Sequence, residues 1–178
     1  DYLEKEGKVK QAEGLRRFYE KVERSNVVFI TQYQQRGFGD AVLRAEPYVR
    51  PPFLVVAADT LVFDLDLNRM PVNSFLVTEV EDPRPYGVVQ VDNEGNVVDV
   101  EEKPKIPKSN LIIVPYYVFD GRIFQALREV KYDKELQLTD GIRNLIREGV
   151  KFRAVRVKET YDLGNFEGYV DYLKRYVK

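Results

Sequence analysis

Two aspartates stand where short stretches of strand-like sequence give way to turns. Asp59 ends the apolar run FLVVAAD, and Asp162 lies in ETYDLGN, two residues before Gly164. In an open α/β sheet, ligands bind beyond the carboxyl ends of the strands, so carboxylates at these points are candidate binding groups. Two carboxylates are enough for Mg²⁺, a hard ion that prefers oxygen ligands. Helix capping or turn formation explains either aspartate as well, and both interpretations stay open at this point.

A polar loop is the second candidate for binding chemistry. It lies in ITQYQQRGFGDAVLRA, residues 30–45, and contains Gly37 and Gly39. It is not a dinucleotide-binding loop, because Val42 stands at the third glycine of G-x-G-x-x-G, and the P-loop motif G-x-x-x-x-G-K-[ST] does not occur in the chain. The glycines fit either a loop that approaches a ligand or a tight strand-to-helix turn that needs a positive φ.

The composition restricts the chemistry further. The 178 residues include 28 basic and 29 acidic side chains, a net charge of -1, which gives no electrostatic reason to expect a nucleic acid or an anionic membrane as partner. Cysteine and histidine are absent, which excludes thiolate and imidazole catalysis and leaves carboxylates as metal ligands. With no membrane-length apolar run and no signal-peptide pattern, we expect a cytoplasmic protein with a small-molecule partner. Frequent Lys, Glu and Arg without Cys would suit a thermophile.

The hydrophobic pattern predicts alternating helices and strands in an α/β domain with a mixed sheet. Asp40 is expected to cap a helix between two buried strands at 26–32 and 53–59, which would form one crossover unit. The closing helix is expected to turn four apolar side chains inward: Phe166, Tyr169, Val170 and Leu173. Further strands are predicted at 74–80, 110–119 and 151–157, with a hairpin in 86–102, and helices at 2–24, 121–130, 139–148 and 165–177.

A longer stretch resembles the sugar-binding core of the sugar-1-phosphate nucleotidyltransferases. This stretch is YGVVQVDNEGNVVDVEEKPKIPKSN, residues 86–110, with a Tyr-Gly start, a hairpin and a Glu-Lys-Pro. QYQQRGFGDAV, VVAAD, LQLTDGI and YDLGNFEGY are similar, in the family's order, to its base-binding turn, first metal aspartate, late helix and second metal aspartate. The resemblance covers essentially all 178 residues and is closest to the UDP-glucose pyrophosphorylase branch. It implies a Rossmann-like nucleotidyltransferase fold with a mixed sheet.

The resemblance also implies roles on the nucleotide side. Gln32 would contact the pyrimidine edge, and Gly37 would let the backbone approach the base. Mg²⁺ held by Asp59 and Asp162 would bind the α-phosphate of the nucleoside triphosphate, UTP or dTTP. These two aspartates would therefore be both metal ligands and catalytic groups.

On the sugar side, the resemblance assigns five positions. Gly87 would offer a backbone contact, Glu102 would accept hydrogen bonds from hydroxyls, and Lys103 would be catalytic by holding the phosphate of the sugar 1-phosphate. Asn110 and Tyr117 fall at further sugar-binding positions. Without the resemblance, the Glu-Lys-Pro would be interpreted as a solvated strand end.

The sequence departs from the family at two places. Family members open with a strand and a G-x-G-T-R loop, whereas this sequence begins DYLEKEGK, similar to a later helical segment; Pro115 stands where the family has a glycine. We therefore expect residues 1–178 to form a single partial nucleotidyltransferase domain without the N-terminal strand and loop, a fragment that is inactive alone. A shortened relative that binds without catalysing, and an unrelated interaction module, are the alternatives.

The expected reaction is uridylyl transfer from UTP to glucose 1-phosphate, which gives UDP-glucose and pyrophosphate. DYLEKEGK, LQLTD and YDLGN favour this branch, while EEKPKIPKSN is equally similar to the thymidylyltransferases. Thymidylyl transfer from dTTP is therefore the alternative. Self-association into a homo-oligomer stays open.

Overall fold

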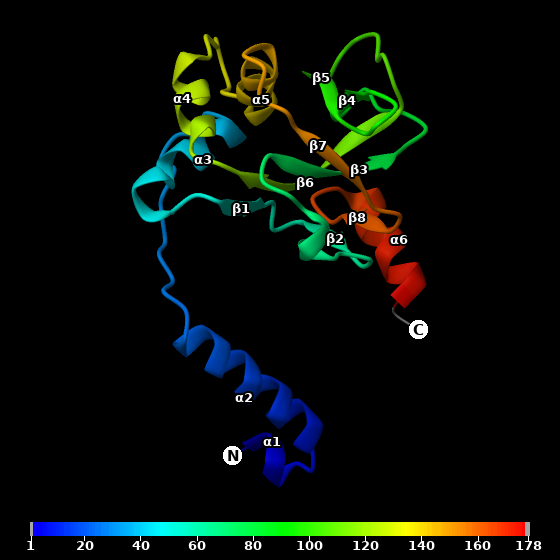
Figure 1. Cartoon of the computed structure of the whole chain (residues 1–178). Helices are drawn as coiled ribbons and strands as arrows, with labels where there is room; N and C mark the ends of the chain where they lie inside the picture. The colour runs from blue at the N-terminus through cyan, green and yellow to red at the C-terminus, as the bar shows by residue number, and fades with distance from the viewer. Residues whose placement is uncertain (1, 177–178) are drawn as a thin grey trace. The chain divides into compact units, whose positions relative to one another are not determined.

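The structure is a computed structural model that describes residues 2–176 (Figure 1). The chain divides into two compact units, Asp1–Thr31 and Gln32–Lys178, and each is described by itself. Val177, the predicted end of the closing helix, lies outside the described residues. Within residues 2–176, no helix is both long and apolar enough to cross a lipid bilayer.

The first unit is helical and then extended. Its helices are α1 (Tyr2–Lys5) and α2 (Val9–Glu23), so the predicted helix over 2–24 is confirmed in type but interrupted near Gly7, which has a φ of 71°. The strand predicted over 26–32 is wrong, because residues 26–31 belong to no strand of the described structure and Phe29 is 93% exposed. A strand forms only where its backbone N–H and C=O groups find partners on a neighbouring strand. The predicted crossover unit therefore lacks its first strand.

The second unit is built on a mixed sheet, as predicted. Five strands follow the order β5-β4-β6-β3-β7. β1 pairs with the C-terminal part of β6, from Tyr116 to Phe119. The β3–β7 pair is parallel and the other pairs of this sheet are antiparallel, while β2 and β8 form a separate antiparallel pair. The strands are β1 (Phe53–Val56), β2 (Thr60–Val62), β3 (Ser74–Glu79), β4 (Gly87–Val91), β5 (Val97–Glu102), β6 (Leu111–Phe119), β7 (Arg153–Arg156) and β8 (Thr160–Asp162).

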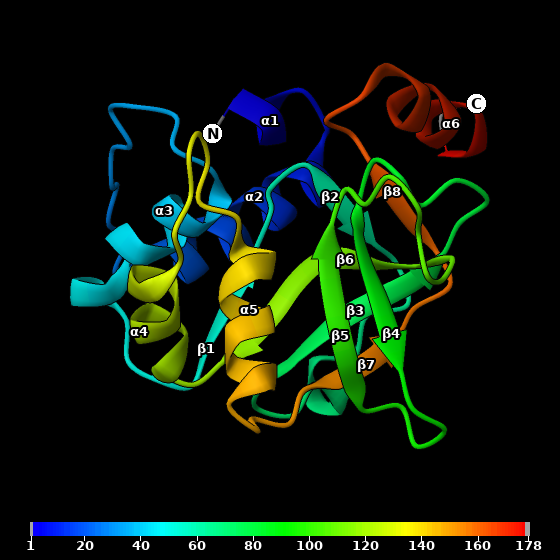
Figure 2. The same cartoon turned by 90° about the horizontal axis from the view of Figure 1, so that it is seen from above.

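Helices cover one face of this sheet. They are α3 (Phe38–Arg44), α4 (Arg122–Glu129) and α5 (Leu138–Arg147), and Figures 1 and 2 show α4 and α5 side by side. The main core lies beneath them and includes Phe75, Phe119, Ile123 and Ile142, none of which is exposed. A smaller cluster of Met70, Leu76, Val114 and Val157 packs with side chains of β2 and neighbouring strands. Short 3₁₀ turns, η1 (Glu46–Tyr48) and η2 (Leu67–Arg69), complete the connections.

The closing helix α6 (Phe166–Tyr176) packs only in part on the predicted face. Phe166 and Tyr169 are exposed, whereas Val170 and Leu173 are half-buried, and no residue of α6 is fully buried. Gly168 faces inward instead, since a Cβ there would lie 2.1 Å from the carbonyl oxygen of Asp162. Tyr176, on the same helical face two turns later, stacks on Phe63 at 4.8 Å between ring centroids. Counting apolar side chains could not detect a contact face that begins at a glycine.

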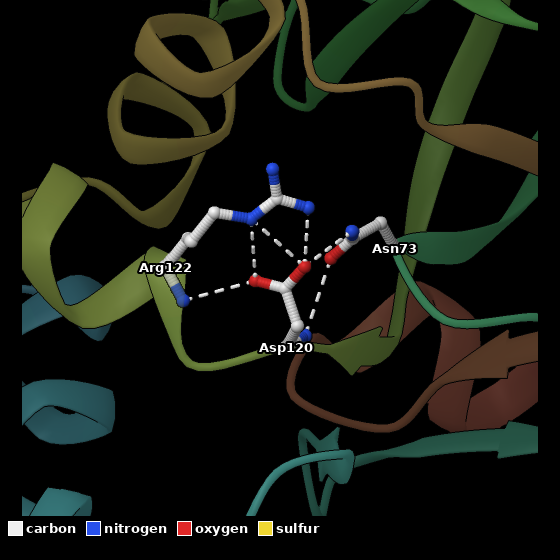
Figure 3. A network of polar contacts seen from close by, with 3 residues as sticks. All are labelled: Asn73, Asp120 and Arg122. Carbon is white, nitrogen blue, oxygen red and sulfur yellow. Dashed lines mark hydrogen bonds and ion pairs between the residues drawn. The ribbon is translucent and has the colours of Figure 1, made fainter.

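A polar network joins the start of β3 to the end of β6 (Figure 3). Asn73 Nδ2 donates to Asp120 Oδ2 at 2.7 Å, and the Asp120 amide donates back to Asn73 Oδ1 at 3.2 Å. Asp120 also accepts from the backbone amide and the guanidinium of Arg122 in the first turn of α4. The hydrogen bonds from Arg122 hold the pKa of Asp120 down at about 2, with Asn73 adding to the effect.

Candidate functional site

A cavity of about 730 Å³ opens in the second unit, near the carboxyl ends of β1 and β3. This volume lies in the range of small-molecule binding sites. The predicted site residues that line it are Asp59, Gly87, Glu102, Tyr117 and Asp162. The fold therefore brings the carboxylates of Asp59, Glu102 and Asp162 to one cavity, although the two aspartates are more than a hundred positions apart in the sequence.

The two aspartates flank one point in space. Thr60 pairs with Asp162 in the β2–β8 ladder, and the Leu163 amide donates to the Asp59 carbonyl oxygen at 2.7 Å. A Cβ on Gly164 would lie 2.8 Å from Asp59 Oδ2 and 3.1 Å from Asp162 Oδ1. A glycine at this position therefore leaves room between the two carboxylates.

The surroundings orient the carboxylates without neutralising them. Asp162 Oδ1 accepts from the Gly164 amide at 2.9 Å, and Asp162 Oδ2 accepts from Asn165 Nδ2 at 2.8 Å. Thr60 Oγ1 donates to Asp59 Oδ1 at 3.4 Å. No lysine or arginine stands among the described residues that line the cavity. The aspartate end of the cavity is consequently acidic.

The carboxylates of Asp59 and Asp162 would suit a Mg²⁺ ion that a phosphate group also binds. The described residues contain no group of three or more acidic side chains arranged to hold a metal ion by themselves. Mg²⁺ usually keeps several waters and binds through one or two carboxylates together with substrate phosphates. The pair Asp59 and Asp162 meets that requirement, whereas an all-protein metal cage is not present in the described part of the chain.

The other end of the cavity is organised around Glu102. Thr139 Oγ1, at the start of α5, donates to Glu102 Oε2 at 2.5 Å, and Thr139 is itself buried. A Cβ on Gly87 would lie 3.3 Å from Glu102 Oε2 and 3.2 Å from Ile113 Cδ1. Gly87 is buried, and a side chain at this position would press against the carboxylate. Thr139 lies in the motif LQLTDGI, and its contact with Glu102 was not predicted from the sequence.

Two tyrosines complete this wall. Tyr117 is buried, and burial raises its pKa, with the nearby negative charge of Glu102 adding to the effect. Burial also raises the pKa of Tyr86, to which the charges of Asp162 and Asp82 contribute. Both phenols are therefore neutral hydrogen-bonding groups at physiological pH. Tyr86 lines the same cavity as Asp162 and Glu102.

Lys103 and Asn110 are not among the residues that line the cavity. Both are exposed. Lys103 follows Glu102 directly and has a φ of 43°, a left-handed conformation that is uncommon for lysine. Its amide donates to the Tyr86 carbonyl oxygen at 3.0 Å, while the Asn110 carbonyl oxygen accepts from the Val80 amide at 3.0 Å. These backbone hydrogen bonds hold Lys103 beside Tyr86 and Asn110 beside Val80, and both Tyr86 and Val80 line the cavity.

Gln32 and Gly37 also lie outside the cavity lining. Gln32 Nε2 donates to the Gly37 carbonyl oxygen at 3.1 Å and to Asp40 Oδ2 at 2.6 Å. Asp40 is therefore not the helix cap that the sequence predicted; Gly37 occupies that position, with no side-chain cap. The hydrogen bonds from Gln32 and Arg44 lower the pKa of Asp40 instead.

The conformation of Gly37 has a packing explanation. Its φ is 96°, and a Cβ there would lie 2.5 Å from the Leu136 carbonyl oxygen. The turn needs glycine for this close approach, whatever it does for a ligand. The loop contributes Phe38 to the cavity, where its ring lies 6.2 Å from that of Tyr117. Phe38 was not predicted from the sequence to be a cavity residue.

The structure is that of an α/β protein with a cavity near the carboxyl ends of two strands, and comparison with known proteins identifies its family. The chain matches the nucleotidyl transferase family model over residues 7–178. The chain therefore belongs to the nucleotidyl transferase family, and the resemblance drawn from its motifs and the predicted Rossmann-like fold are confirmed.

Individual relatives differ in their reactions. Over 126 residues the chain is 40% identical to the bifunctional protein GlmU of Methanocaldococcus jannaschii, covering 68% of this chain and 31% of that protein. Over 152 residues it is 33% identical to glucose-1-phosphate thymidylyltransferase of Streptomyces antibioticus, covering 79% and 43%. A crystal structure of UDP-glucose pyrophosphorylase complexed with UDP-glucose has a TM-score of 0.83 at 27% identity, covering 94% and 72%. The chain thus spans less than half the length of the GlmU protein and of the thymidylyltransferase.

Proposed function

We propose that this chain is part of a sugar-1-phosphate nucleotidyltransferase that makes UDP-glucose and pyrophosphate from UTP and glucose 1-phosphate. The observation that carries the proposal is the single cavity with Asp59 and Asp162 at one end and Gly87 and Glu102 at the other. In this proposal residues 1–178 are one part of the catalytic domain, and the family match over residues 7–178 supports that view.

The reaction needs positioning and charge neutralisation more than acid–base catalysis. An oxygen of the sugar phosphate attacks the α-phosphorus of UTP, and the bond from that phosphorus to pyrophosphate breaks. A phosphate oxygen is already nucleophilic, so the absence of His and Cys is no obstacle. Asp59 and Asp162 would hold Mg²⁺, which neutralises phosphate charge when bound.

The remaining side chains bind and orient the substrates. Glu102, fixed by the hydroxyl of Thr139, accepts hydrogen bonds from the sugar hydroxyls. Gly87 offers its backbone, and Tyr117 contributes a neutral phenol to the same wall. Lys103 neutralises the incoming phosphate.

Three further roles complete the proposed site. Asn110 lies on the sugar side, and Gln32 and Gly37 meet the base. The bonds from Gln32 to Gly37 and Asp40 would then have to be exchanged for bonds to the base.

Thymidylyl transfer is the second candidate. The Streptomyces antibioticus relative, a glucose-1-phosphate thymidylyltransferase, favours it. Calorimetric titration of the chain with UDP-glucose and with dTDP-glucose, each with Mg²⁺, distinguishes the two. We expect tighter binding of UDP-glucose, and the reverse order would favour the thymidylyl reaction.

The metal role is tested by Asp162→Asn. Removing one of two carboxylates should weaken Mg²⁺-dependent UDP-glucose binding, and in a longer protein with turnover it should lower kcat by about 10²-fold or more. Asp133→Asn is the matched control, because Asp133 is exposed and does not line the cavity. Equal Mg²⁺ dependence in the two variants would remove Asp162 from the site.

The chain of 178 residues by itself should release no pyrophosphate from UTP and glucose 1-phosphate. The described lining of the cavity contains no lysine or arginine, so the charge of a triphosphate has little to balance it there. A pyrophosphate assay, with the intact mass measured in the same sample, checks this expectation. Mg²⁺-dependent turnover by a chain of this mass would contradict it.

A further inference from the structure

A second cavity lies beside β7, at the edge of the sheet. Its volume is about 410 Å³, and the charged residues that line it are Arg69, Glu94, Arg153 and Arg156. Among the described residues, none lines both cavities. Leu111 lines this one and Ile112 lines the first. The two cavities therefore share no lining residue in the described part of the chain, although both include residues of β6.

Backbone contacts bring the arginines together from distant parts of the sequence. The Arg153 amide donates to the Asn73 carbonyl oxygen at 2.9 Å, which places the start of β7 beside the segment that follows η2 and Arg69. The hairpin between β4 and β5 closes the other side, because the Ala154 amide donates to the Gly95 carbonyl oxygen at 3.2 Å. The cavity is therefore framed by three segments that main-chain hydrogen bonds hold in place.

Two of the three guanidinium charges have no carboxylate partner. Arg156 forms an ion pair with Glu79 at 2.7 Å, outside the lining. Arg153 Nη1 donates to the neutral amide oxygen of Asn96 at 3.1 Å, which orients its guanidinium over the hairpin. Among the described residues, no carboxylate lies within ion-pair distance of Arg69 or Arg153.

The acidic residue of the lining has a neutral partner of its own. Glu94 Oε2 accepts from Asn96 Nδ2 at 3.3 Å. Three arginines face Glu94 across the lining, and Glu79 offsets Arg156, so one positive charge remains in excess in a chain whose net charge is -1.

The rest of the lining is apolar and consists of Pro71, Val91, Leu111, Ala154 and Val155. Guanidinium groups bind phosphate oxygens through paired N–H donors, and a cavity of this size holds a small organic molecule. We propose that this second cavity binds a phosphate monoester, with its phosphate between Arg69 and Arg153 and its carbon skeleton against Leu111 and Val155.

Amide NMR spectroscopy of the ¹⁵N-labelled full chain tests the proposal, with glycerol 3-phosphate as the probe at constant ionic strength. We expect saturable shifts at the amides of Gly95, Ala154 and Val155. The amides of Gly87 and Gly168, which line the first cavity, should not shift. Non-saturable shifts, or larger shifts in the first cavity, would overturn the proposal.

Variants and a second anion sharpen the test. Arg69→Gln with Arg153→Gln should weaken binding at least about tenfold, since each guanidinium supplies charge-assisted hydrogen bonds. Arg69→Gln alone, which leaves the bond from Arg153 to Asn96 intact, should weaken it to an intermediate degree. Arg50→Gln is the control for loss of one charge, because Arg50 is exposed and outside both linings.

Acetate, a monoanion without a phosphate, should bind at least about tenfold more weakly than glycerol 3-phosphate. Equal weakening by Arg50→Gln, or acetate binding as tight as the phosphate, would overturn the proposal.

Discussion

Two apolar runs of similar composition have different fates in this protein. NVVFITQ, residues 26–32, remains without strand structure, whereas the first half of FLVVAAD, residues 53–59, forms β1. β1 pairs in register with β6, from Phe53 opposite Phe119 to Val56 opposite Tyr116, while residues 26–31 pair with no described strand. A segment with high strand propensity therefore forms a strand only where a partner supplies hydrogen bonds and a core to pack against.

The largest difference should be in amide hydrogen exchange. Amides of β1 that donate to β6 exchange only when the pair opens, so we expect them to exchange at least about 10²-fold more slowly than the amides of residues 27–30. Mass spectrometry of the exchanged chain after proteolysis measures both segments in one sample. Comparable protection in the two segments would show that residues 27–30 have a partner in solution.

Matched phenylalanine substitutions should separate the runs by stability. Phe53 stacks on Phe124 at 5.1 Å between ring centroids, so Phe53→Ala should lower the free energy of unfolding by about 2–3 kcal/mol. Phe29 is almost fully exposed, and Phe29→Ala should change it by no more than about 0.5 kcal/mol. Urea unfolding followed by circular dichroism provides both values. If Phe29→Ala lowered the free energy of unfolding as much as Phe53→Ala, Phe29 would have to be packed as closely as Phe53.

The polar network at the end of β6 should make a smaller, pH-dependent contribution. Asp120 follows Phe119, the residue opposite Phe53, and its folded pKa of about 2 lies below its ordinary value of 3.8. The stabilisation is therefore complete above pH 3.8 and is lost as the pH falls towards 2, with a size on the order of 1 kcal/mol because Arg122 is exposed.

Asp120→Asn should remove this part of the acid sensitivity, and Asp133→Asn should leave it unchanged. Unfolding measured between pH 2 and pH 5 checks both variants. An unchanged pH profile in Asp120→Asn would show that the network does not stabilise the strand end.

The smallest effect on stability is expected for Phe29→Lys, which should instead change solubility. An exposed apolar segment with unpaired backbone groups favours association with other chains, and a charge opposes it. Light scattering against protein concentration should show less self-association in the variant, with an unchanged unfolding midpoint. Equal scattering would mean that residues 26–31 do not mediate association.

Much of the second unit could be predicted from the sequence because its signals are local. Alternating and β-branched runs identified β3, β4, β5, β6 and β7, and helical periodicity identified α4 and α5 to within a few residues. Glycine contacts were not predictable in this way. A Cβ on Gly37 would collide with the backbone of Leu136, far away in the chain, and a Cβ on Gly168 would collide with the backbone of Asp162 across a turn; hydrophobic periodicity contains no such information.

The sequence by itself determined the chemistry available to this protein. Without His or Cys, the chain can offer carboxylates, amides, hydroxyls and cationic side chains, and its ordered motifs indicated the family that the comparisons confirm. Only the tertiary structure decided which of these groups meet. It brought Asp59 to Asp162 and Thr139 to Glu102, left the side chains of Lys103 and Asn110 outside the cavity lining, and left residues 26–31 unpaired. The reason is physical: residue types and local periodicity depend on neighbours along the chain, whereas ion sites, close glycine contacts and strand partners depend on segments far apart in it.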